Sequence, residues 1–478
     1  MPRLSIAGGF YVHSSLPVSN QQCVNLYVSL VEGQAITDKV LLGTPGVSLL
    51  VSTGAGSASL GNRGSNVKNG IPYVVNGETL YSIDRAISGT GEEVFSYTAL
   101  GAIAPGDRLT MTNNGLQLMI LIPGGKGYIY NELAVPVLQE ITAPGFRASG
   151  DPQYVVFVDG YFACTTDSKK WIVSALNDGL SWNALDFSSA ESDPDIIVAL
   201  AVAKNQVYIL GASTTEGYQN IGGADFPFQR NNVFMDKGCS APFSVINANN
   251  TFYMIGAGKN EGPAIWMFTN SDFQRVSTDA IDRILGEYTD LELNTAFAWS
   301  YSENGAYFVG FTLPGRTFVL ELVTQMWHER KSIIGTNETR WRVNGIVSAY
   351  GRNLVTDFVS GYIGSLSLRY FTEYGFAIPS YFSTMPFYSE NDPIAAPSLE
   401  LFMESGVGTV ECPDPQVSLA ISDSNKTFSY ERSRSIGKLG EYHRRIIWRR
   451  NGVFSRFATL LFRVSDPVKK CFITLEAE

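Results

Sequence analysis

The sequence predicts an all-β fold, in which a β-propeller of six or seven blades precedes a C-terminal β-sandwich-like domain. Three observations predict it. Glycine, tyrosine and phenylalanine are abundant (46, 23 and 28 residues) and only 17% of residues are charged, which favours short strands and tight turns over helices. A hairpin-like pattern recurs through the middle of the chain, and further strand-like segments follow a proline-rich stretch.

The recurring pattern is an Asn- or Gly-containing turn, an apolar segment, a second glycine-rich turn and another apolar segment. Its copies begin at residues 69, 114, 160, 205, 250, 304 and 353. Turn residues between β-branched and aromatic runs are typical of β-hairpins. A repeat of about 45–50 residues is the length of one four-stranded blade, so we expect blades stacked around an axis. A large β-sandwich with evenly spaced hairpins is the alternative.

Four segments are expected along the chain. Residues 1–60 form strands that close the propeller or pack between domains, and residues 61–375 form the propeller. An inserted helix is expected near 277–288, where apolar side chains fall on one face. Residues 376–397 hold four prolines, too many for a central strand or a helix, and predict a linker. Residues 398–478 then form the β-sandwich-like domain with basic strands.

The composition favours no membrane segment, metal or cofactor. No stretch approaches the roughly 20 consecutive apolar residues that span a bilayer. The five cysteines are scattered without a CxxC pair, which predicts buried thiols in a reducing compartment. The three histidines share no metal-ligand spacing. We therefore expect no membrane association, no metal site and no cofactor.

Catalytic motifs are also missing from the sequence. No G-x-S-x-G motif accompanies His13, His328 or His443, and no glycine-rich segment has the spacing of a phosphate-binding loop. A glycosidase needs two converging carboxylates, but 45 acidic residues offer too many pairs to select one. The segment ALNDGLSW (175–182) resembles a degraded Asp box of sialidase-like propellers, where this turn is structural. We predict no catalytic residues and no enzyme.

A basic segment near the C-terminus is the strongest functional signal. Residues 432–470 contain eleven Lys and Arg residues and two acidic ones, which leaves 24 basic and 43 acidic residues in the rest of the chain. Apolar residues interrupt the basic ones, as Ile446, Ile447 and Trp448 do between two arginine pairs, so the segment is expected to pack as strands. A nucleic-acid site, a solvated strand face and a subunit interface all fit it.

We favour the interface, because arginine pairs bidentately with carboxylates at packed contacts and the rest of the chain has carboxylates in excess. The candidate interface residues are Arg444, Arg445, Trp448, Arg449, Arg450, Arg456 and Arg463.

Several stretches together resemble one known family. They are the tail motif W-R-R-x-G-x-x-x-R followed by LLFRV (448–464), VNLYVSLVEG…LLGTPGV (24–47), SAESDPDIIVALAVAKNQVYILGASTTEGY (189–218), FMDKGCSAPFSVINANNTFYMIG (234–256) and STDAIDRILGEYT (277–289). In this order and spacing the chain resembles the packaged DNA stabilization protein family, the tail hub or nozzle proteins of short-tailed, podovirus-type bacteriophages.

The resemblance implies a non-enzymatic structural protein of the virion tail, made in the host cytoplasm. It implies a homo-oligomeric ring of six below the portal and its adaptor proteins, which extends the DNA channel and helps to retain the packaged genome. The plug or needle and the tail fibres or spikes would attach to this ring. Double-stranded DNA would pass without specific binding, because lumenal cations paired with phosphate would slow ejection. A virion-associated propeller glycosidase or glycan-binding module is the alternative.

Overall fold

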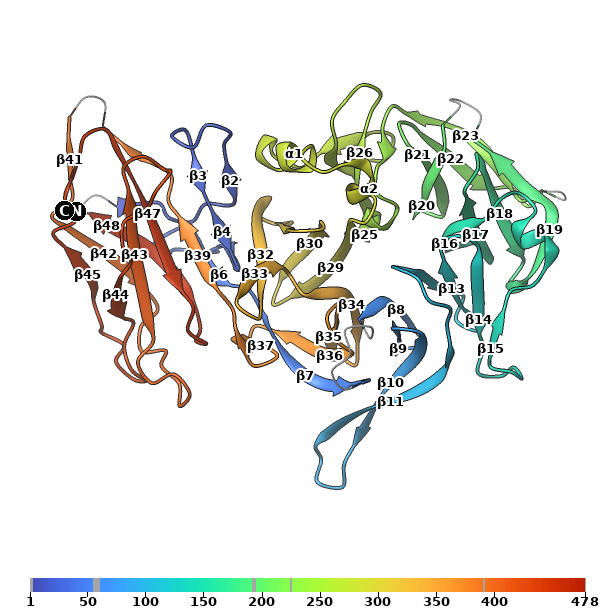
Figure 1. Ribbon diagram of the computed structural model, residues 1–478, viewed down its shortest axis with the longest axis horizontal. Coiled ribbons are helices and arrows are strands. Elements are labelled where there is room, and N and C mark those ends of the chain that lie inside the picture. Colours follow the sequence, from blue (N-terminus) through green and yellow to red (C-terminus); the bar gives the residue numbers. More distant parts are fainter. Residues whose placement is uncertain (1–2, 55–60, 191–194, 224–225, 390–391, 478) are drawn as a thin grey trace.

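The computed structural model describes residues 3–54, 61–190, 195–223, 226–389 and 392–477 (Figure 1). Residues 55–60 of the expected N-terminal segment and residues 390–391 of the expected linker lie outside them. In the described part nearly all regular structure is β: small sheets follow one another around an axis, and a two-sheet domain lies beside them. The predicted all-β fold, a propeller followed by a sandwich, is confirmed.

Each blade is an antiparallel sheet whose strands follow in chain order. Blade 1 contains β8 (Asn62–Lys68), β9 (Ile71–Asn76), β10 (Thr79–Ile87) and β11 (Glu93–Ala102). Blade 2 contains β12 (Thr110–Asn113), β13 (Leu118–Ile122), β14 (Lys126–Tyr130) and β15 (Leu138–Glu140). Blade 3 contains β16 (Pro152–Val158), β17 (Tyr161–Thr166), β18 (Lys170–Ala175) and β19 (Asp178–Ser189), preceded by the short helix η2 (Pro144–Arg147). Blade 4 contains β20 (Ile197–Ala203), β21 (Gln206–Gly211), β22 (Thr215–Asn220) and β23 (Phe228–Met235).

The later blades are less regular. Blade 5 contains β24 (Gly238–Cys239), η3 (Pro242–Ser244), β25 (Ile246–Ala248), β26 (Thr251–Ala257), β27 (Ala264–Phe268) and β28 (Phe273–Arg275). Two helices, α1 (Asp279–Leu285) and α2 (Asp290–Leu293), lead to blade 6. Blade 6 contains β29 (Phe297–Glu303), β30 (Ala306–Thr312), β31 (Thr317–Glu321) and β32 (Met326–Ile334), with β33 (Asn337–Arg340) paired to β32. Blade 7 contains β34 (Val343–Ala349), β35 (Arg352–Asp357), β36 (Tyr362–Ser367) and, from the N-terminal region, β7 (Gly46–Ser52).

The described residues form seven blades, which close into a ring. The innermost strands pack in sequence, β8 on β12, then β16, β20, β25, β29 and β34, and β34 packs back on β8. The propeller is therefore seven-bladed, within the predicted six or seven. Blade 7 is completed by β7, which pairs antiparallel with β36, so the outer strand of the last blade comes from the start of the chain.

The same tight turn joins the innermost strand to the second strand in six blades. Asn69 (φ 53°) and Gly70 (φ 80°) make it in blade 1, and Asn304 (φ 48°) and Gly305 (φ 84°) make it in blade 6. Type I′ turns need positive φ at both central residues, which Asn, Asp and Gly adopt most readily. The corresponding pairs are Asp159–Gly160, Lys204–Asn205, Asn249–Asn250 and Tyr350–Gly351. These turns produce the period that the sequence shows.

The C-terminal domain is a sandwich of two sheets that also recruits N-terminal strands. The first sheet has the order β45 (Ile446–Arg449), β42 (Ser398–Met403), β48 (Cys471–Ala477), β6 (Lys39–Gly43) and β5 (Leu26–Leu30), with β1 (Arg3–Leu4) beside β48. The second has the order β4 (Cys23–Val24), β39 (Ser380–Ser383), β47 (Phe457–Val464), β43 (Gln416–Ser422) and β44 (Arg432–Ser435), with β40 (Phe387–Tyr388) paired to β47. Smaller pairs are β2 (Tyr11–Val12) with β3 (Asn20–Gln21), β41 (Ile394–Ala395) with β46 (Val453–Phe454), and β37 (Thr372–Glu373) with β38 (Phe376–Ala377).

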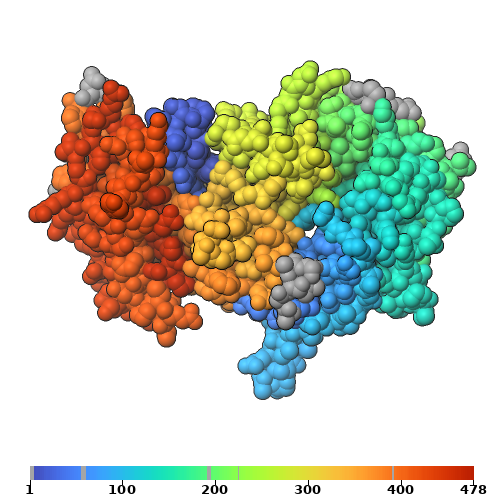
Figure 2. Space-filling model, in the orientation of Figure 1, coloured from blue at the N-terminus to red at the C-terminus, as the bar shows by residue number. Residues whose placement is uncertain are grey.

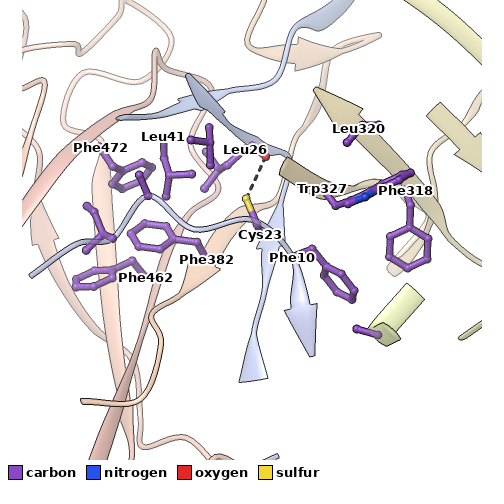
Figure 3. Packing of buried hydrophobic residues seen from close by; sticks show 14 of the residues in the cluster. Phe10, Cys23, Leu26, Leu41, Phe318, Leu320, Trp327, Phe382, Phe462 and Phe472 are labelled. Atoms are coloured by element: carbon purple, nitrogen blue, oxygen red, sulfur yellow. Dashed lines mark hydrogen bonds between the residues drawn. The ribbon is translucent and has the colours of Figure 1, made fainter. Parts of the chain in front are cut away.

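Propeller and sandwich share one sheet and one hydrophobic core. Strand β4 pairs with β32 of blade 6 on one side and with β39 on the other, which gives a continuous 11-stranded sheet. Trp327 of blade 6, Leu26 and Leu41 of the N-terminal strands, and Phe382 and Phe462 of the sandwich belong to the same buried cluster (Figure 3). The two domains are therefore packed into one body.

The expected linker at 376–397 contains the short strands β38, β39, β40 and β41, and β39 lies inside a sheet. Ser380–Ser383 forms the buried strand β39, paired on both sides within the second sandwich sheet. Pro379 and Pro386 flank this strand and do not interrupt it, so its own N–H groups stay free for the ladder. A short proline-free interval is enough for a central strand.

One hairpin projects from the propeller. The strands β10 and β11 of blade 1 extend beyond the body of the molecule (Figure 2), and most of β11 is exposed. Near the turn of this arm, where Glu93 is opposite Ile87, Glu93 forms ion pairs with Arg85 of the same hairpin and with Arg352 of blade 7. The arm is thus tied to the neighbouring blade by charge.

Candidate partner interface on the sandwich

The basic segment lies along one side of the sandwich and divides between its two sheets. Strand β44 is the edge of the second sheet and β45 is the edge of the first, and the two edges pack against each other (Figure 1). Strand β47 lies inside the second sheet, between β39 and β43. The arginines of β44, β45 and the adjoining loop therefore gather at a common edge.

Side chains close this edge to further strand pairing. The indole Nε1 of Trp448 donates to the Arg432 carbonyl at 2.7 Å, and Arg434 Nε donates to the Ile447 carbonyl at 3.0 Å. Arg432 Nη2 donates to Asn451 Oδ1 at 2.6 Å. An open strand edge invites pairing with another chain, and bonds of this kind occupy its carbonyls. The edge thus presents charge to a partner and few free backbone groups.

Four arginines surround a pocket of about 350 Å³ at this edge, which we call the arginine pocket. Its lining residues are Arg434, Ser435, Arg444, Arg445, Ile447 and Arg449. No carboxylate of a described residue lines it. Beside it, Arg445 Nε lies 2.7 Å from Glu400 Oε1, and this bond to the guanidinium lowers the pKa of Glu400.

The other three guanidinium groups of the arginine pocket have no ion pair with any described residue. Arg434 is bound only to main-chain carbonyl groups, and Arg444 and Arg449 are exposed. Like charges within a few ångströms repel one another, and an acidic partner would relieve that repulsion. The arrangement can therefore bind carboxylate or other anionic groups.

The remaining predicted interface residues have different positions. Arg450 and Arg456 are exposed in the turns before and after β46, outside the pocket. Trp448 is fully buried (0% exposed), because side chains alternate across β45, and it cannot touch a partner. Arg463 lies at the joint between the domains, where its Nε is 3.1 Å from Glu431 and its Nη1 is 3.6 Å from Glu338 of blade 6.

Sequence reasoning left Arg434 out of the candidate residues. It lies on β44, whose sequence R-S-R-S places Arg432 and Arg434 on one face of the strand. That alternation was the available signal. The pocket thus joins Arg434 to the predicted Arg444, Arg445 and Arg449.

Chemistry-bearing residues elsewhere do not form a catalytic or metal site among the described residues. No group of three or more His, Cys, Asp and Glu there could hold a metal ion. His328 is buried and burial lowers its pKa to about 3, so the ring is neutral and out of reach of substrate. In the same part of the chain, no helix is long and apolar enough to cross a membrane.

Two family models match the chain over most of its length. The model of the bacteriophage P22 Gp10 β-propeller matches residues 2–370, and the model of the P22 Gp10 β-sandwich matches residues 380–478. The chain belongs to the P22 Gp10 family. Its resemblance to the packaged DNA stabilization proteins is thereby confirmed. As a member of the P22 Gp10 family it is a structural protein of a bacteriophage tail, located in the virion and associated with other virion components, in a family that is not enzymatic.

Several solved structures resemble the chain at low sequence identity. The designed protein Ika8 shares 14% identity over 73% of this chain and 99% of its own, with a TM-score of 0.38. The Neurospora crassa Pan2 WD40 domain shares 11% over 68% and 95%, with a TM-score of 0.40, and PorZ of Porphyromonas gingivalis shares 9% over 75% and 45%, with 0.39. No curated protein sequence matches the chain.

Proposed function

We propose that the chain is the hub or nozzle subunit of a short-tailed phage. Six copies form a ring below the portal and adaptor, extend the DNA channel, help to retain the packaged genome and attach the plug or needle and the fibres or spikes. Membership of the P22 Gp10 family supports the tail location. The subunit interface is inferred from the arginine pocket, where three guanidinium groups have no carboxylate partner among the described residues.

The charge distribution suits a ring. A closed ring of identical subunits uses two different patches, one meeting the other on the next copy. The basic segment supplies one patch, and the rest of the chain, with 43 acidic against 24 basic residues, supplies carboxylates for the second. Contacts of this kind steer subunits together and fix their register.

The DNA channel of the proposed ring lies between copies. Inside one propeller, side chains of non-neighbouring blades meet across the axis: Arg108 of blade 2 stacks on Phe297 of blade 6, and Tyr154 of blade 3 contacts Phe243 near blade 5. A duplex cannot pass through an axis filled in this way. With its cations withdrawn into subunit contacts, the acidic surface that remains gives phosphates little to bind.

A charge reversal tests the interface. In the variant Arg444→Glu with Arg449→Glu we expect a native melting temperature and loss of incorporation into tails, because both side chains are exposed and lie outside any internal ion pair of the described residues. The matched control reverses Lys126 and Lys169 on blades 2 and 3, which are also exposed. The control should incorporate normally. Normal incorporation of the arginine variant would remove these residues from the interface.

A further inference from the structure

A second cationic pocket lies at the mouth of the propeller axis. It has a volume of about 490 Å³, and its walls include Arg108, Phe243, Phe297, Leu313, Arg340 and Asn344. These residues come from blades 2, 6 and 7 and from η3 of blade 5. Blades 2 and 6 are not neighbours, so their residues can meet only at the axis. We call this space the axial pocket.

Two arginines of the axial pocket are held rigidly over aromatic rings. The Arg108 guanidinium carbon Cζ lies 3.4 Å from the centroid of the Phe297 ring, and Arg108 Nη2 donates to the Asn344 carbonyl at 2.7 Å. Arg340 Cζ lies 4.0 Å from the Phe358 ring centroid, and Arg340 Nη2 donates to Asn344 Oδ1 at 3.3 Å. Stacking and amide contacts fix both groups in place without neutralising either charge.

Some sheltered arginines of this chain have carboxylate partners, whereas Arg330, like Arg108 and Arg340, is held by an aromatic ring and hydrogen bonds to uncharged groups. Arg342 Nη2 lies 2.6 Å from Asp357 Oδ2, and Arg316 Nε lies 2.8 Å from Glu329 Oε1. Within the described residues, neither Arg108 nor Arg340 forms an ion pair. Charges removed from water usually have such a partner, because their desolvation is costly.

The pKa values of Arg108 and Arg340 are both lowered. Burial, together with the neighbouring Arg340, lowers the pKa of Arg108 to about 9. Burial lowers the pKa of Arg340 to about 10, and Asp357, which opposes that shift, is already held by Arg342. Among the described residues that line the axial pocket, Asp107 is the one carboxylate, and it raises the pKa of Arg63 against the larger lowering by burial. The guanidinium groups of Arg108 and Arg340 therefore have no neutralising carboxylate in the described part of the chain.

A third arginine extends the cationic surface. An adjoining pocket of about 370 Å³ shares Asp107, Arg108, Arg340 and Asn344 with the axial pocket and adds Arg63 and Glu78. Arg63 is only 8% exposed, and its Nη2 has no hydrogen-bond partner in the described structure, whereas its Nε and Nη1 donate to main-chain carbonyls. A buried donor without a partner is unusual, and a group that enters the adjoining cavity can accept a hydrogen bond from it.

We propose that the axial pocket binds an acidic peptide segment of another protein. A carboxylate of the segment lies between the guanidinium groups of Arg108 and Arg340, and an adjacent apolar side chain packs on Phe297 and Leu313. A peptide fits better than nucleic acid, because the walls combine two arginines with Phe, Leu and Pro side chains. The volume falls within the range of about 300–1,000 Å³ typical of ligand pockets, far too small for a duplex.

Binding of a short probe by the full chain tests this proposal. The probe is the blocked tripeptide acetyl-Leu-Glu-Leu-amide, compared in calorimetry with acetyl-Leu-Gln-Leu-amide and with inorganic phosphate. We expect saturable binding of the Glu peptide, at least tenfold tighter than that of the Gln peptide and of phosphate. Equal binding of the two peptides, tighter binding of phosphate, or no binding of the Glu peptide would each overturn the proposal.

Variants separate the site from the fold and from the ring interface. Arg340→Gln should lower the affinity for the Glu peptide at least tenfold, and Arg340→Lys should restore part of it by keeping the charge. The variant Arg444→Glu with Arg449→Glu should bind like the wild type, because its changes lie on the sandwich. If Arg340→Gln fails to fold, Arg108→Gln takes its place, and undiminished binding by the folded variant contradicts the site.

Discussion

Strand β32 of blade 6 buries three ionisable residues, and each is stabilised in a different way. Glu329 accepts two bonds from Arg316, at 2.8 and 2.9 Å. Arg330 donates to the Pro45 carbonyl at 2.7 Å and stacks on a tryptophan ring. His328 has no hydrogen-bond partner on either ring nitrogen in the described structure, so only the neutral ring is tolerated there.

His328 should make the protein sensitive to acid. Burial lowers its pKa from 6.5 to about 3, so below pH 6.5 the unfolded chain binds a proton that the native chain does not. Stability then falls as the pH falls, by about 1.4 kcal/mol per pH unit. His328→Gln keeps a buried polar group without the titration. Between pH 7 and pH 5 the wild type should lose about 2 kcal/mol more than this variant in urea unfolding; parallel pH profiles would contradict the assignment.

For a single residue, the sequence predicts which face of a strand its side chain occupies better than it predicts which residue the side chain binds. Alternation along β45 is enough to put Trp448 inside and Arg449 outside. Which arginine meets a carboxylate of its own chain depends on strand order. Arg445 pairs with Glu400 because β42 lies beside β45, and Arg463 reaches Glu338 because blade 6 continues into the sandwich sheet. Neither neighbour is visible in the sequence.

Among the elements, β7 decides whether the propeller closes. It pairs with β36 on one side and with β37 on the other, and its first residue, Gly46, donates its N–H to the Tyr370 carbonyl at 3.0 Å. A Cβ atom at Gly46 would lie 2.5 Å from the carbonyl oxygens of both Tyr370 and Thr372. No rotamer change relieves a clash with backbone atoms.

Gly46→Ala should therefore weaken the closure of the ring. We expect a loss of about 1–3 kcal/mol in urea unfolding, with faster hydrogen exchange in β36, because the strand must shift to admit the methyl group. Gly262→Ala is the control, since a Cβ there meets nothing within 4 Å and φ is not positive. The control should change stability by less than about 0.5 kcal/mol. An equally small effect at Gly46 would show that β7 tolerates displacement.

The regular spacing of the blades could be predicted from the sequence because it depends on local turns. Positive φ at two successive residues restricts the turn to few residue types, and that restriction repeats with the blades. Strand pairings between distant segments have no comparable sequence signature. The insertion of β4 between β32 and β39, and of β6 beside β48, joins segments more than 300 residues apart and depends on the shared core.

Charge separation is the property of the whole molecule that matters most for assembly. A basic edge on the sandwich and an acidic remainder attract when they lie on neighbouring copies. Such pairs are screened by salt, since the Debye length falls from about 10 Å at 0.1 M to about 3 Å at 1 M.

Incorporation of the wild-type chain into tails should accordingly fall steeply with ionic strength. The neutral variant Arg444→Gln with Arg449→Gln should incorporate more slowly at low salt and respond less to added salt. The measurement is the fraction of chain incorporated in vitro between 0.05 and about 0.5 M salt, within the range where screening changes most. A flat profile for the wild type would mean that apolar contacts drive assembly.

Electron cryomicroscopy of intact tails tests the central claim most directly. The account predicts a ring of six copies around the DNA channel, with each arginine pocket within salt-bridge distance of carboxylates on the next copy and with every propeller axis filled by its own side chains. A different copy number, or arginine pockets that face solvent or the phosphates of lumenal DNA, would contradict it.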